Sequence, residues 1–147
     1  MRAAKFIDRS GPGVDEWAAR FGLLAAEALG REMVTAIRDS LDPGPGPRTG
    51  RQYIKPGTRT IYTASGPGEH PAVREGVLRD SFHLIPAVIA GGFVLSGAGT
   101  ALKTDDGEHH LAAVLNHGTD DGRIQPRPFI DHTLEELAER WGAEVRR

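Results

Sequence analysis

The segment that decides the fold covers residues 14–41 and reads VDEWAARFGLLAAEALGREMVTAIRDSL. Its apolar residues recur at steps of three and four, the spacing that puts side chains on one face of an α-helix. Asp15 is a suitable N-cap for this helix. At about 1.5 Å per residue the helix is roughly 40 Å long, more than a core of this size requires. We therefore expect that part of it projects toward a partner subunit, or that Gly22 and Gly30 bend or divide it. The periodic positions are Val14, Trp17, Phe21, Leu24, Ala28, Leu29, Met33, Ile37 and Leu41.

Segments rich in proline and glycine separate the periodic ones. The chain has 19 Gly and 10 Pro in 147 residues, and many of them gather in residues 42–50 and 65–71. Three prolines in the first of these segments withhold N–H donors and prevent helix formation, which predicts a linker or exposed loop. Residues 1–13 have no periodicity and are expected to form an N-terminal arm. Residues 14–147 are expected to form a single α+β domain.

A small antiparallel sheet is predicted in the middle of the chain. Residues 59–64 are a short strand candidate. After residue 77 the apolar period becomes two, and Pro86 confines that strand to a sheet edge or a bulge. Gly91–Gly92 then turns the chain into a second strand, broken or bulged at 96–99. The apolar positions expected on one face of the first strand are Leu78, Phe82, Leu84 and Val88, and the pieces of the second are 93–95 and 100–102.

Two helices are expected after the sheet. Residues 110–115 lack alternation and predict a short helix, with Gly118 as its left-handed cap. The last helix begins at Pro128, which suits a first turn, or at Thr133, which forms a capping box with Glu136. Its periodic positions are Ile130, Leu134, Leu137, Trp141 and Val145. The fold class is therefore α+β: a long N-terminal helix, a small antiparallel sheet, and a short helix and a C-terminal helix packed on one side.

Composition and charge limit the function classes. The chain has 18 Lys+Arg against 20 Asp+Glu with interleaved signs, which argues against nucleic-acid binding. The absence of cysteine excludes disulfides, thiol catalysis and cysteine zinc sites. The apolar stretch 84–95 is far shorter than the roughly 20 residues of a membrane-spanning helix, and the start lacks the apolar region of a secretory signal. Trp17 and Trp141 lie on apolar helix faces and are expected to pack in the core or against another subunit.

Histidines and aspartates are the remaining candidates for chemistry. Nitrogen and oxygen ligands for a metal occur close together in the sequence, but His110 and His117 are seven residues apart, two helical turns rather than the one turn that brings two imidazoles to one ion. The Thr-Asp-Asp-Gly segments at 104–107 and 119–122 favour tight turns over acid–base pairs. No serine lies in a Gly-x-Ser-x-Gly motif. We therefore expect no catalytic residue, no cofactor and no bound metal. The metal candidates weighed are His109, His110, His117 and Asp120.

Three segments resemble motifs of the HK97 gp10-like family of small phage neck and tail components. Residues 71–81, PAVREGVLRDS, resemble the family's Pro…Gly-x-Leu-Arg-x-Ser signature. Residues 111–119, LAAVLNHGT, resemble its short helix that ends in Gly-Thr. Residues 124–130, IQPRPFI, resemble its Pro-x-Pro-Phe motif. The order and spacing fit over about residues 68–142. Leu111 and Asn116 depart from the family's usual Tyr and Glu. The matching positions are Gly76, Leu78, Arg79, Ser81, Gly118, Thr119, Pro126, Pro128 and Phe129.

This resemblance implies a structural virion protein with no enzymatic activity, a ring-forming neck subunit for tail completion or head-to-tail joining between the portal complex and the tail tube. The implied partners are copies of itself and adjacent connector, head-closure, tail-terminator or tail-tube proteins, with DNA passing through the ring lumen and no membrane. The implied location is the phage particle, after synthesis in the host bacterial cytoplasm. A tail-terminator or head-closure (stopper) subunit is an alternative in the same particle. A small metal-dependent hydrolase using His109, His110 and His117 is an alternative from another class.

Overall fold

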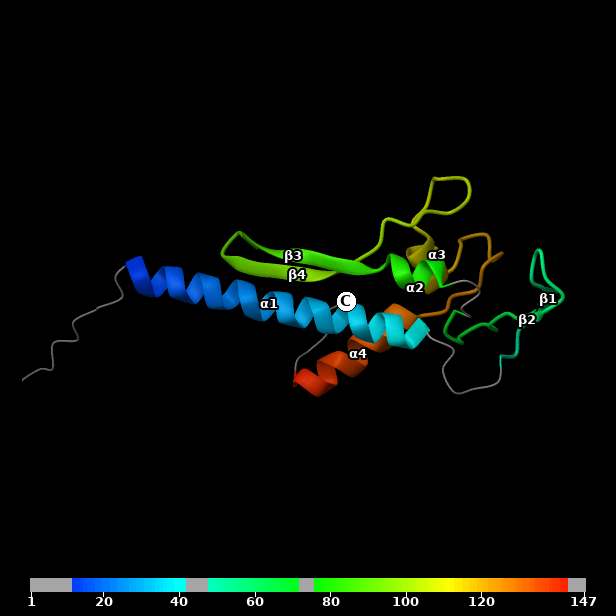
Figure 1. The fold of residues 1–147 in the computed structure, drawn as a ribbon, viewed down its shortest axis with the longest axis horizontal. Coiled ribbons are helices and arrows are strands. Elements are labelled where there is room, and N and C mark those ends of the chain that lie inside the picture. The colour runs from blue at the N-terminus through cyan, green and yellow to red at the C-terminus, as the bar shows by residue number, and fades with distance from the viewer. Residues whose placement is uncertain (1–11, 42–47, 72–75, 143–147) are drawn as a thin grey trace, which may run out of the picture.

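The computed structural model describes residues 12–41, 48–71 and 76–142, and it confirms the α+β class (Figure 1). The expected arm up to residue 11 and most of the expected loop at 42–50 lie outside the described residues. Two separate two-stranded antiparallel sheets replace the one sheet expected. The elements are α1 (Pro12–Leu41), β1 (Gln52–Ile54), β2 (Ile61–Thr63), α2 (Val77–Ser81), β3 (His83–Ala90), β4 (Phe93–Gly99), α3 (Leu111–His117) and α4 (Phe129–Trp141).

The helix α1 is one continuous helix of 30 residues. At about 1.5 Å per residue it is roughly 45 Å long and forms the axis of the molecule. The expected N-cap at Asp15 is wrong, because the helix begins three residues earlier at Pro12, whose missing N–H suits a first turn. Gly22 and Gly30 do not divide the helix.

Two different apolar stripes follow each other along α1. The stripe that ends at Ala28 and the stripe that starts at Leu29 are offset by about 100°, because these residues are adjacent in the sequence. Ile37 and Leu41 of the second stripe are buried in the core. Trp17 of the first stripe is 65% exposed. The periodicity therefore predicted the helix correctly but describes two faces rather than one.

The β3–β4 hairpin lies along α1 and is held close by small residues (Figure 1). A Cβ added at Gly30 would lie 2.6 Å from Leu84 Cδ1 and from Ser96 Oγ, and 3.3 Å from the Gly97 backbone nitrogen. One at Gly22 would lie 3.2 Å from Val94 Cγ2. The two glycines, eight residues apart, are about 80° apart around the helix, and both face the hairpin. They are therefore packing sites for the hairpin rather than breaks in the helix.

A bulge at Pro86 sets the faces of the hairpin. Leu84 pairs with Ala98 but Val88 pairs with Leu95, so β3 has one extra residue between the two pairs. Pro86 lies in this interval and has no N–H to donate to a partner strand. The bulge was predicted, but the prediction that Val88 shares a face with Leu84 is wrong, because the extra residue reverses the alternation.

Two further strand predictions are wrong. Residues 77–81 form the helix α2, which begins after Gly76 with φ of 79° and is closed by a Ser81 hydroxyl donating to the Leu78 carbonyl at 2.7 Å. The strand β4 continues through residues 96–99 and ends at Gly99, so 100–102 is not part of it. The Ile85 side chain packs over Gly99, where an added Cβ would lie 3.0 Å from Ile85 Cδ1.

The core lies at the C-terminal half of α1, where the other elements converge. Phe129 is fully buried and its ring meets that of Phe82 edge to face at 6.4 Å. The helix α4 packs on α1 on the side away from the hairpin (Figure 1). It begins at Phe129, one residue after the expected start, with Pro128 as its N-cap, and Thr133 lies inside the helix. Gly118 ends α3 as predicted, with φ of 79°, but its ψ of -169° is outside the left-handed helical region that was expected. The buried cluster contains Val34, Ile37, Leu41, Phe82, Ala112 and Phe129.

Replacing Gly30 with leucine tests the close contact between α1 and the hairpin. We expect Gly30→Leu to lower the free energy of unfolding by about 1–3 kcal/mol, because a side chain here separates two packed layers. Urea denaturation measures the change, with Ala25→Leu as control because Ala25 is exposed on the same helix. Equal stability of the two variants would contradict the packing described.

Candidate functional site

The first motif segment anchors α2 to the core. Gly76 adopts a positive φ that other residues rarely take, and its carbonyl accepts from the Asp80 N–H at 2.8 Å. Leu78 packs against the buried cluster, and the Ser81 hydroxyl lies 2.7 Å from that of Thr100. Arg79 pairs with Asp80 at 2.8 Å, and this ion pair lowers the pKa of Asp80. These residues shape the turn into α2 and hold this helix against the core.

The second and third motif segments meet each other. A Cβ at Gly118 would lie 2.7 Å from the Ile124 carbonyl oxygen and 3.1 Å from the Pro126 ring. The Thr119 hydroxyl accepts from the Ile124 N–H at 3.0 Å. The Pro126 carbonyl accepts from the Gly68 N–H at 3.1 Å, which ties this loop to the loop at 65–71. The arrangement leads the chain from α3 into α4, where Pro128 precedes the buried Phe129.

Asn116 joins α3 to α4 inside the chain. It is 2% exposed, its Oδ1 accepts from the Ile130 N–H at 3.0 Å, and its Nδ2 donates to Asp131 at 2.9 Å. The amide therefore satisfies one of the unpaired N–H groups at the start of α4. This departure from the family's usual Glu thus has a contact of its own, within the chain.

The histidine candidates do not converge. His109 and His110 are exposed before α3, and His117 is exposed at its end. Over residues 12–41, 48–71 and 76–142, no three His, Cys, Asp or Glu side chains are grouped so as to hold a metal ion. Asp120 belongs to the turn that follows α3. The geometry therefore gives no support to a metal centre.

Both Thr-Asp-Asp-Gly segments form turns. The Thr104 hydroxyl donates to Asp106, and the Thr119 hydroxyl donates to Asp121 at 2.7 Å. These hydrogen bonds are the main cause of the lowered pKa of both carboxyl groups. A general acid near neutral pH needs a raised pKa instead, so the two aspartates act as turn residues.

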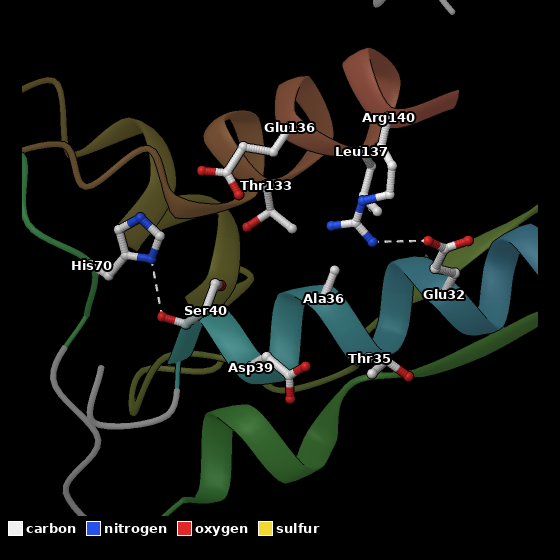
Figure 2. A pocket seen from close by; sticks show the side chains of 10 residues that line it. All are labelled: Glu32, Thr35, Ala36, Asp39, Ser40, His70, Thr133, Glu136, Leu137 and Arg140. Carbon is white, nitrogen blue, oxygen red and sulfur yellow. Dashed lines mark hydrogen bonds and ion pairs between the residues drawn. The ribbon is translucent and has the colours of Figure 1, made fainter. Parts of the chain in front are cut away.

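A polar pocket of about 300 Å³ lies between α1 and α4 (Figure 2). Glu32 crosses between the helices, accepting from Arg140 at 3.0 Å and from the Trp141 indole at 3.1 Å. At the other end His70 lies beside Ser40. The lining residues are Glu32, Thr35, Ala36, Asp39, Ser40, His70, Thr133, Glu136, Leu137 and Arg140.

The hydroxyl groups in this pocket are not activated. His70 Nδ1 lies 3.0 Å from the Ser40 backbone carbonyl rather than from its hydroxyl. The Ser40 hydroxyl donates to the Ile37 carbonyl at 2.8 Å, and the Thr133 hydroxyl donates to the Phe129 carbonyl at 2.7 Å. A nucleophile needs a base within hydrogen-bond reach of its own proton. The pocket is therefore a polar joint between two helices.

Exposed apolar side chains cover the outer side of the first half of α1. Phe21 and Leu24 are 60% and 63% exposed, and Trp17 is still more so. The Trp17 and Phe21 rings stack at 5.5 Å with 13° between their planes. With Ala28 they span an arc of about 60° on a helix of 100° per residue. We call Trp17, Phe21, Leu24 and Ala28 the helix stripe.

A second apolar surface lies on the hairpin. Phe93 is 70% exposed, and about half of the Val88 and Leu95 side chains is exposed. Val88 and Leu95 are partners across the strands, and the alternation puts them opposite Leu84 and Ala98, which pack on the core. We call Ile85, Val88, Phe93 and Leu95 the hairpin face.

The two apolar surfaces are the candidate functional site, and composition alone did not reveal them. The sequence signal for the helix stripe is the step of one between Ala28 and Leu29, which separates it from the second set of apolar positions, the set that ends in the buried Ile37 and Leu41. In the described part of the chain, no helix combines the length and apolar character needed to cross a membrane. Comparisons with protein-family models, curated proteins and solved structures gave no match.

Truncating Asn116 tests the joint between α3 and α4. We expect Asn116→Ala to lower the free energy of unfolding by about 1–3 kcal/mol, because it leaves the Ile130 N–H without its acceptor. Chemical denaturation measures this, with Ala113→Ser on the exposed side of α3 as control. An Asn116→Ala protein as stable as the control would show that the amide bridge contributes nothing.

Glu69 predicts an acid dependence of stability. Its pKa is lowered, first by the Thr49 hydroxyl at 2.6 Å and then by the Gly66 N–H at 2.7 Å. The folded state therefore holds the proton less tightly than the unfolded state, so the free energy of unfolding falls as the pH drops below about 4.3. Glu69→Gln and Thr49→Val should each reduce this fall in the free energy of unfolding, as measured by denaturation from pH 7 to pH 3. An unchanged fall in both variants would refute the assignment.

Proposed function

We propose that this chain is a structural virion protein of a tailed bacteriophage or prophage. It builds a ring at the neck, between the portal complex and the tail tube, and acts in tail completion or head-to-tail joining without enzymatic activity. Its partners are copies of itself and the neighbouring connector, head-closure, tail-terminator or tail-tube proteins. It is made in the host cytoplasm and located in the particle, with DNA passing through the ring lumen.

The observation that carries this proposal is the pair of unpartnered apolar surfaces. Trp17 and Phe21 on the helix stripe and Phe93 on the hairpin face are each at least 60% exposed. With their aliphatic neighbours, each of the two surfaces leaves roughly 300 Å² of apolar area uncovered. Apolar patches larger than a few hundred Å² mark contact surfaces in water-exposed proteins. A long α1 is then explained, because its first half serves contacts outside the chain.

The placement of the motif residues supports the same proposal. Gly76, Gly118 and Phe129 belong to three segments of one resemblance, and all three hold the end of the molecule where the core lies. The motifs therefore maintain the fold that presents α1 and the hairpin. A catalytic signature would instead bring reactive side chains together, and in the described part of the chain His109, His110 and His117 do not form a group that could hold a metal ion.

The alternative positions in the same particle differ in their partners. A tail terminator contacts the tail tube, and a head-closure subunit contacts the portal side. We favour the tail-completion position because the three motifs of the resemblance are those of tail components. The purified chain is expected to be largely monomeric and to assemble on the neighbouring ring.

Loss of the gene tests the proposal in the phage or prophage that encodes it. We expect a stop codon near the start of the reading frame to give DNA-filled heads and separate tails in electron micrographs, because the joint between them is missing. A plasmid copy of the intact gene should restore joined particles and infectious titre. Joined, infectious particles without the gene product would overturn the proposal.

A further inference from the structure

The helix stripe and the hairpin face lie on opposite sides of one two-layer unit. The hairpin covers the side of α1 that carries Gly22 and Gly30. At 100° per residue the centre of the helix stripe is about 180° from the centre of that side. The hairpin face points away from α1 on the other layer, because Val88 and Leu95 alternate with the residues that face the helix. The unit is therefore apolar on both outer surfaces.

We infer that copies of this chain associate head to tail, with the helix stripe of one copy packed on the hairpin face of the next. The inference rests on the proposed ring-forming function and names the surfaces that form the ring. Two different patches on opposite sides cannot both be covered by one two-fold contact, which pairs a patch with itself. A heterologous contact covers both in every copy, and it closes into a ring when the rotation between copies allows.

The shapes of the two surfaces are complementary. Inside the chain, bulky hairpin residues such as Val94 and Leu84 meet glycines on α1. Between chains the sizes are reversed, since the helix stripe is bulky and the outer side of the hairpin includes Gly97, where an added Cβ would meet nothing within 4 Å. Gly97 leaves room for Trp17 or Phe21 to approach the sheet backbone. The second contact thus repeats the helix-on-hairpin layering of the first.

The apolar area of the two surfaces is enough for a weak contact between two copies. Taking about 150–250 Å² for an aromatic and roughly 100 Å² for an aliphatic side chain, each surface exposes about 300 Å². Contact would bury about 600 Å² of apolar area, or about 1,000 Å² once the polar rim of an ordinary interface is included. This is at the lower limit for specific interfaces. A pair of copies is therefore weakly held, whereas every copy in a ring makes two contacts.

Single cysteines test the contact directly, because the chain has none of its own. Leu24 and Leu95 are exposed on the two surfaces, so Leu24→Cys and Leu95→Cys leave the core intact. One variant is labelled with ¹⁵N, the two are mixed at high concentration, and a short bismaleimide is added. Mass spectrometry of the linked peptides should show 24-to-95 pairs at least tenfold more often than 24-to-24 or 95-to-95 pairs. The doubly substituted chain should form a ladder of covalent oligomers.

Two controls make the outcome decisive. Ala113→Cys, on the exposed side of α3, should give no enrichment of mixed pairs with either variant. Adding Phe93→Glu to the Leu95→Cys chain should reduce the mixed pairs at least tenfold, while urea denaturation shows that this chain still folds. Dominant 24-to-24 or 95-to-95 pairs would replace the inference with a two-fold dimer. Mixed pairs no more frequent than with the Ala113→Cys control would overturn it.

The experiment separates this inference from the proposed function. Absent 24-to-95 pairs together with unjoined heads and tails in the gene-loss experiment would mean that the neck subunit uses other surfaces. Abundant 24-to-95 pairs with joined, infectious particles would mean that the chain forms head-to-tail oligomers outside a phage neck.

Discussion

The close approach of the β3–β4 hairpin to α1 is the contact on which the rest of the molecule depends. It is possible because Gly30 and Gly22 present no side chain to Leu84, Ser96 and Val94. Bulky residues in their place would separate the strands of the hairpin from the helix. The same contact fixes which surfaces remain outside: one side of α1 is covered by the hairpin, and the opposite side is left apolar and exposed.

The molecule therefore divides into a packed end, which holds the core, and a two-layer arm, which consists of the first half of α1 and the β3–β4 hairpin. At the packed end, α2, α3 and α4 close around Phe129, and the buried amide of Asn116 links two of these helices. In the two-layer arm, the helix and the hairpin pack on each other, and the outer side of each layer is exposed. A two-layer arm with both outer surfaces apolar is incomplete as an isolated unit. It becomes a repeating structure when identical arms stack, and this relates the internal packing to the proposed assembly.

Local signals predicted much of the fold, and tertiary packing decided the rest. The long helix, the bulge at Pro86 and the cap at Gly118 follow from periodicity and from the chemistry of proline and glycine. The helix α2 was missed because it has only five residues, and the spacing of four between Leu78 and Phe82, the residue that follows the helix, also suits a strand. The role of Gly30 depends on a hairpin more than fifty residues away, which no local pattern contains. The helix stripe was within reach, since the offset between adjacent Ala28 and Leu29 is visible in the sequence, whereas the hairpin face required the observed register.

Tryptophan fluorescence gives the most direct measurement of the central claim, which is that the outer side of α1 is a contact surface between copies. The chain has two Trp, and Trp141→Phe leaves Trp17 as the only reporter. Trp17 is 65% exposed in the single chain, so its emission should start at the red, water-exposed end. The account predicts a shift of this emission to shorter wavelength as concentration rises, in step with the mass gained in sedimentation. An emission that stays red while the chain assembles, or a chain that stays monomeric both at its solubility limit and on its neighbouring ring, would contradict it.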